Sequence, residues 1–155
     1  MILYYTYKQK TKIFAKSLGK VLGYQVHELE SSISKKSGLR FMIHALKLIF
    51  TRKTYPVDNM PAVIPGEIFV CSPVWGGHIA APCKYFLEKS DLKKTTVNLV
   101  LTAGIPTHQY KKAAEKYLRT LDCVPGTVHL FATSNKIMPD EEVLAEQLCE
   151  IFRPE

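Results

Sequence analysis

Short apolar runs alternate along the chain with stretches of helical periodicity. The apolar runs are typical of strands, and we expect strands at residues 2–5, 25–29, 67–71, 96–101 and 126–132. In the stretches that follow them, apolar residues recur at i, i+3, i+4 and i+7, which predicts helices beginning near residues 11, 39, 80, 110 and 140. Strict alternation of strand and helix favours an α/β fold with a parallel sheet and helices on both of its faces.

Polar residues distinguish the expected edge strands from the central ones. The runs at 2–5, 67–71 and 96–101 are mostly apolar, as central parallel strands are, whereas those at 25–29 and 126–132 interleave polar residues. This distribution predicts a five-stranded parallel sheet in the order 2-1-3-4-5, inside a three-layer α/β/α sandwich. At 155 residues the chain has the size of one domain, so we expect residues 1–155 to form a single unit.

The strongest amphipathic pattern lies at residues 39–50. Its apolar residues follow helical spacing: Leu39, Met42, Ile43, Leu46, Ile49 and Phe50. A serine- and lysine-rich loop is expected before this helix, at residues 31–38, and a linker with three prolines after it, at residues 51–66. Gly23 is a suitable residue to end the first helix.

The expected strand order also locates a binding site. In open parallel sheets, ligands bind beyond the carboxyl ends of the strands, at the point where the winding reverses. The reversal here lies between the first and third strands. The turns that follow Tyr5, Cys71 and Leu101 should therefore line one site.

The turn after Tyr5 runs into a helix and carries hydroxyl and ammonium groups. Its residues are Thr6, Tyr7, Lys8, Gln9, Lys10 and Thr11. A helix start offers unpaired backbone N–H groups and a positive dipole end, so it favours a bound phosphate. The alternative interpretation is an ordinary strand-to-helix turn with solvated lysines, because the turn lacks glycine.

The turn after Cys71 holds the only tryptophan of the chain, beside two glycines. Its residues are Ser72, Pro73, Val74, Trp75, Gly76 and Gly77. An aromatic ring at this place can stack on a planar ligand, and glycine lets the backbone approach it closely. Alternatively, Trp75 only packs against the next helix. The turn after Leu101 starts with the small residues Thr102, Ala103 and Gly104, which either leave room for a flat ligand or form an ordinary turn.

These residues resemble the flavodoxin family, and more closely the short flavodoxin-like proteins of bacteria. Residues 68–82, IFVCSPVWGGHIAAP, are similar to the family's strand followed by Thr/Ser-Pro-Val-Trp, a small-residue turn and a helix opened by alanine or proline. Residues 2–15 match in layout, with an apolar strand, two tyrosines and a phosphate loop that enters a helix. The resemblance implies that the expected sandwich is flavodoxin-like.

The resemblance further implies an FMN site. Residues 6–11 would hold the phosphate, residues 72–77 would form one wall of the flavin with Trp75 stacking on it, and residues 102–104 would line its pyrimidine side. Two features depart from the family. Lys8 and Gln9 stand where its phosphate loop has threonine and glycine, and the formal charge is +7 where electron-carrying flavodoxins are typically acidic.

Three roles remain open on the sequence. An FMN-binding electron carrier is favoured, because there is no separate nicotinamide site and neither Gly-x-Gly-x-x-Gly nor a Walker loop occurs. An NAD(P)H-dependent quinone or FMN reductase is the first alternative. A flavin-free interaction domain with a degenerate phosphate loop is the second. The five histidines lack a metal-ligand spacing, so no metal is expected.

Charge and composition bear on partners and location. A basic chain favours anionic partners, and we expect redox partner proteins with acidic docking surfaces. The lysines are spread over helical faces without interleaved aromatic residues, which argues against nucleic acid as a partner.

No apolar run approaches the roughly 20 residues of a membrane helix. The start lacks the basic segment of a signal peptide and the four cysteines form no Cys-x-x-Cys pair, so we expect a cytoplasmic protein without a membrane partner.

Overall fold

A parallel sheet lies at the centre of the computed structural model, which describes residues 1–63, 66–133 and 141–152. Within these residues its parallel strands are β1 (Ile2–Tyr4), β2 (Val26–Glu28), β3 (Glu67–Trp75), β5 (Thr96–Ala103) and β6 (Val124–Ala132). Their order is β2-β1-β3-β5-β6. The expected order 2-1-3-4-5 is therefore confirmed, because the short strand β4 (His78–Ile79) only shifts the numbering.

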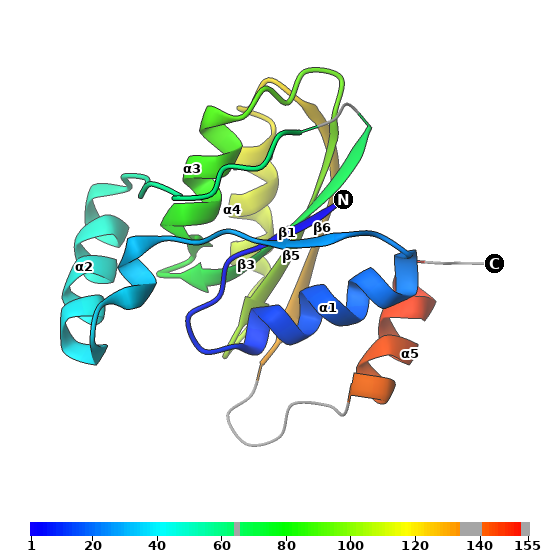
Figure 1. The fold of residues 1–155 in the computed structure, drawn as a ribbon, viewed down its shortest axis with the longest axis horizontal. Coiled ribbons are helices and arrows are strands. Elements are labelled where there is room, and N and C mark those ends of the chain that lie inside the picture. Colours follow the sequence, from blue (N-terminus) through cyan, green and yellow to red (C-terminus); the bar gives the residue numbers. More distant parts are fainter. Residues whose placement is uncertain (64–65, 134–140, 153–155) are drawn as a thin grey trace.

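Helices cover both faces of the sheet. Figure 1 shows α1 (Lys10–Leu22) and α5 (Glu141–Phe152) on one face, and α3 (Ala81–Lys89) and α4 (His108–Leu118) on the other. Successive residues of a strand point to opposite faces. In β1, accordingly, Ile2 packs with the α1 and α5 side chains and Leu3 with those of α3 and α4. The predicted three-layer sandwich is confirmed.

The end of β3 differs from the sequence-based expectation. The strand was predicted to stop at Cys71 and a loop to follow, but β3 continues to Trp75 and turns back into β4. Gly76 and Gly77 form the turn with φ of 54° and 84°, as a type I′ hairpin requires. Serine and proline are poor strand formers, so the apolar run of residues 67–71 did not indicate that the strand continues. The extension also changes partner, because β3 pairs with β5 up to Pro73 and with β4 after it.

Helix α2 (Gly38–Thr51) matches the predicted amphipathic helix in position but not in burial. An apolar stripe of this kind normally faces a core. In α2 only a narrow side faces inward, where Ala45 is buried and Phe41 and Leu48 pack against the core. The rest of the stripe faces solvent, with Leu39, Met42, Ile43, Leu46 and Phe50 all exposed. A single turn of 3₁₀ helix, η1 (Ser32–Lys35), precedes α2 within the expected loop.

Smaller details of the prediction also stand. Helix α1 ends at Gly23, which has φ 68° and donates its backbone N–H to the Gly19 carbonyl. None of the helices within the described ranges is long and apolar enough to cross a membrane. The carboxyl ends of β1, β3 and β5 are thus held by a packed sheet. The three turns that follow these strands lie beyond the same end of the sheet.

A candidate ligand site at the carboxyl ends of the strands

The turns after β1, β3 and β5 meet at one cavity of about 660 Å³, which is within the size range of small-molecule sites. The structure brings together twelve of the fifteen residues that the sequence predicted for this site: Thr6, Tyr7, Lys8, Lys10, Thr11, Pro73, Val74, Trp75, Gly76, Thr102, Ala103 and Gly104. Gln9, Ser72 and Gly77 do not line the cavity.

One end of the cavity is polar and positively charged. The Thr11 hydroxyl is buried and lies 2.9 Å from the Thr102 hydroxyl, which joins the start of α1 to the end of β5. The Lys10 ammonium donates a hydrogen bond of 3.0 Å to the Thr133 carbonyl at the end of β6. Helix α1 starts at Lys10 without an acidic residue in its first turn, and no carboxylate of the described residues lines the cavity. This end can therefore attract an anion through lysine charge and free helix N–H groups.

Aromatic rings form another part of the cavity wall. The Trp75 ring meets Tyr5 and Phe41 edge-on, with centroid distances of 5.6 Å and 5.5 Å. The Phe41 ring in turn stacks on Tyr7 at 3.5 Å with an interplanar angle of 2°. Phe41 thus links α2 to both the first turn and the hairpin. Trp75 is fixed by these contacts while it still lines the cavity.

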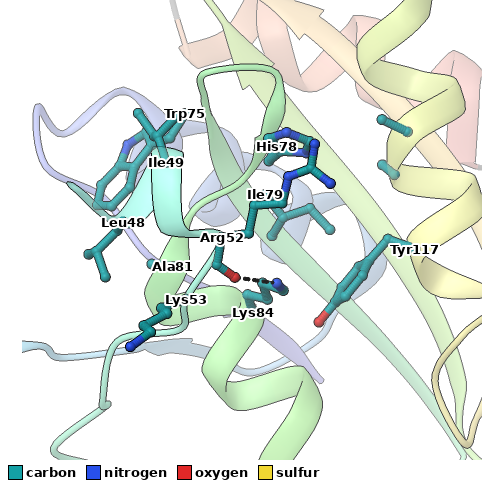
Figure 2. A pocket seen from close by; sticks show the side chains of 12 residues that line it. Leu48, Ile49, Arg52, Lys53, Trp75, His78, Ile79, Ala81, Lys84 and Tyr117 are labelled. Carbon is teal, nitrogen blue, oxygen red and sulfur yellow. Dashed lines mark hydrogen bonds between the residues drawn. The ribbon is translucent and has the colours of Figure 1, made fainter. Parts of the chain in front are cut away.

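A second, smaller cavity of about 220 Å³ is also lined by Trp75 (Figure 2). It shares Trp75 and Ile49 with the larger cavity, and it is otherwise lined from the end of α2, from β4 and from α3 and α4. Its polar rim carries Arg52, Lys53 and Lys84, of which Lys84 donates a 2.9 Å hydrogen bond to the Arg52 carbonyl. The sequence did not predict this cavity. Its lining includes the first residue of α3 and the last residue of β3, but not the turn after β1 or the end of β5.

Comparison with known proteins shows a likeness only in structure, since no protein-family model and no curated protein matches the sequence. A candidate flavoprotein from Bacteroides uniformis superposes with a TM-score of 0.72 and 13% identity over 96% of each chain. A flavoprotein in complex with FMN from Lactobacillus acidophilus superposes with a TM-score of 0.61 and 20% identity, over 83% of this chain and 90% of that one. A Streptococcus pneumoniae flavodoxin superposes with a TM-score of 0.52 and 13% identity, over 96% of this chain and 93% of that one.

The chain has the flavodoxin-like fold. At these low identities the likeness establishes the architecture, and the function has to be argued from the site.

The three predicted residues outside the cavity support the fold instead. The buried Ser72 hydroxyl accepts the Ala80 N–H at 3.0 Å and donates to the Pro73 carbonyl at 2.9 Å, so it holds the hairpin against the start of α3. Gly77 lies in the hairpin turn beside Tyr110. Gln9 is the residue before α1, with φ 62°.

Helix α2 supplies cavity residues that the sequence did not predict. They are Gly38, Phe41, Met42, Ala45, Leu46 and Ile49, and Thr133 after β6 joins them. The apolar pattern of residues 39–50 predicted a helix but did not indicate that part of its stripe would border a ligand cavity.

The cavity itself contains few groups for acid–base chemistry. Among the residues that the structure describes, its lining holds no carboxylate, histidine or cysteine. Burial raises the pKa of the Cys71 and Cys83 thiols, that of Cys83 to about 12, so both are protonated core residues at neutral pH. Burial likewise raises the pKa of Tyr5 to about 12. The described side chains are therefore suited to binding a ligand rather than to moving its protons.

Gln9 gives a first testable prediction, because its φ of 62° is unfavourable for a residue with a side chain. Gln9→Gly should stabilise the chain by about 0.5–1 kcal/mol, since relief of the left-handed strain exceeds the extra entropy of glycine in the unfolded state. Thermal unfolding should show a Tm higher by about 1–4 °C.

Gly23→Gln is the reverse control for Gln9→Gly. Gly23 has φ 68°, and a Cβ there would meet no atom within 4 Å, so the substitution adds only conformational strain. It should lower the Tm. A Tm for Gln9→Gly equal to or below that of the unaltered chain would show that Gln9 is not strained.

Proposed function

We propose that the chain binds FMN in the larger cavity and takes part in electron transfer. The observation that carries the proposal is the shape and charge of that cavity. It has room for a ligand of flavin size, and its lining combines lysines, threonines and a helix start with the ring of Trp75. The FMN complex of the Lactobacillus acidophilus flavoprotein, which has a similar fold, supports the choice of cofactor.

The residues present fit the parts of FMN. The phosphate would be held by Thr6, Lys8, Lys10 and the first N–H groups of α1. Lys8 stands where the family has a hydroxyl donor, so a positive charge replaces a hydroxyl at that position. Trp75 would flank the ring system. Residues 102–104 would line its edge, and a Cβ built on Gly104 meets no atom within 4 Å, so there is free space beside that backbone. The bound flavin supplies the redox chemistry, while the chain binds and orients it.

An electron carrier remains the favoured role over a reductase. A reductase needs a place for the nicotinamide dinucleotide beside the flavin. The second cavity, at about 220 Å³, is small for a ligand of that size. Partners with acidic docking surfaces and a cytoplasmic location belong to the same proposal. Robust turnover of NADPH with a quinone in a steady-state assay would assign the chain to the reductases instead.

Titration of the flavin-free chain with FMN tests the proposal. Binding should quench flavin fluorescence and raise the Tm, because a ligand that binds only the folded state stabilises it by about 2.7 kcal/mol at a hundred times its Kd. The matched control is Val143→Ser, an exposed site on α5 that lies outside both cavities and should bind FMN equally. Unchanged fluorescence together with an unchanged Tm would favour the flavin-free interaction domain.

A further inference from the structure

Helix α2 exposes more large apolar surface than any other described element. The side chains of Leu39, Met42, Ile43, Leu46 and Phe50 are 47–83% exposed and occupy adjoining positions around the helix; we call these five residues the α2 arc. Figure 1 shows α2 at the outer end of the molecule, beside rather than within the two helical layers. Contiguous exposed apolar surface of this kind marks an interaction site.

The segment of chain that contains the α2 arc is strongly basic. Residues 31–57 contain six lysines and arginines and no aspartate or glutamate, which amounts to +6 of the formal +7. The six are Lys35, Lys36, Arg40, Lys47, Arg52 and Lys53. Lys35, Arg40 and Lys47 line neither cavity, and none of the six has an ion pair with a carboxylate in the part of the chain that the structure describes. Their charge is therefore available to an external partner.

We propose that the α2 arc docks on an anionic phospholipid bilayer. An amphipathic helix with an apolar side and a lysine- and arginine-rich side lies in the plane of a membrane interface, with the apolar side in the headgroup and acyl boundary. Each nearby cation adds attraction to anionic headgroups. The sequence predicted no membrane partner, and this proposal replaces that prediction. It does not depend on the flavin.

The chemistry of the α2 arc favours a bilayer over another protein surface. Protein interfaces carry about one hydrogen bond per 100–200 Å², but all five side chains of the arc lack a donor and a strong acceptor. A bilayer requires no such bond. A second copy of the chain, placed arc against arc, would bring six cations against six and be repelled.

Docking would also orient the larger cavity. Met42 and Leu46 belong to the α2 arc and line that cavity as well. Part of the cavity wall would therefore lie at the surface of the bilayer.

Co-sedimentation with lipid vesicles tests the proposal. The unaltered chain should bind vesicles of mixed phosphatidylcholine and phosphatidylglycerol, bind pure phosphatidylcholine weakly, and lose binding as salt is raised. Ile43→Ser/Phe50→Ser should lower the partition coefficient about tenfold or more. Neither residue lines a cavity, so FMN affinity and the Tm should be unchanged. The matched control is Val143→Ser/Ile151→Ser, which removes two exposed apolar side chains from α5 and should leave vesicle binding intact.

A charge pair tests the electrostatic part separately. Arg40→Gln/Lys47→Gln should weaken binding to the anionic vesicles and flatten its salt dependence, whereas Lys112→Gln/Lys116→Gln on α4 should have a smaller effect. Three results would overturn the proposal: no sedimentation of the unaltered chain with anionic vesicles, equal loss in the α5 control, or a dimer in light scattering that Ile43→Ser/Phe50→Ser converts to a monomer.

Discussion

FMN should bind the Lys8→Gln/Lys10→Gln double variant about a hundredfold more weakly than the unaltered chain, whereas riboflavin should bind both about equally. Both lysines line the larger cavity, and none of the lining residues within the described ranges carries a carboxylate to compensate their charge. Hydrogen bonds to charged groups contribute about 1.5–3 kcal/mol each, so two of them account for about 3 kcal/mol. Riboflavin lacks the phosphate and makes neither contact.

Flavin fluorescence titrations with the two ligands would measure this difference. The matched control is Lys12→Gln/Lys16→Gln, which removes the same amount of charge from positions in α1 that lie outside the cavity. Lys12 lies 3.4 Å from Glu28 rather than at the site. If the control lost as much FMN affinity, the effect would come from overall charge. If riboflavin affinity fell in parallel, the lysines would support the cavity without contacting the phosphate.

The sequence predicted the fold well because its signals are local. A strand with a period of two and a helix with a period of 3.6 leave their patterns within a few residues. The polar residues of 25–29 and 126–132 indicated edge strands correctly, because only the edges of a parallel sheet tolerate them. Once the strand order was predicted, the general position of the site followed from the topology.

The missed features depend on contacts between distant parts of the chain. Strand β4 has two residues, too few for a periodic pattern, and it forms only because Gly76 and Gly77 turn the chain back on β3. For α2, the pattern defined an apolar side but not how much of it the rest of the chain would cover. The extent of coverage depends on the contacts of Phe41 with Tyr7 and Trp75, which join residues far apart in sequence.

The Gly76→Ala variant should be destabilised by about 3 kcal/mol and should lose flavin affinity. Alanine at φ 54° costs about 1–2 kcal/mol, because a left-handed conformation is unfavourable for L-residues. The added Cβ would also lie 2.5 Å from Cγ2 of Ile49 in α2. Ile49 is β-branched and in a helix, so its side chain has little freedom to turn away, and relief of the overlap costs about 1–3 kcal/mol.

A double-mutant cycle separates the two causes. Gly77→Ala is the control within the same turn: its φ is 84°, but its Cβ meets only the Tyr110 ring at 3.4 Å, so it adds conformational strain with little overlap. In an Ile49→Ala background, the cost of Gly76→Ala should fall to about that of Gly77→Ala, as urea unfolding would measure. An unchanged cost in that background would mean that α2 does not press on the hairpin. Because Trp75 directly precedes this turn, the same cycle measured by FMN titration shows how far α2 positions the indole at the cavity.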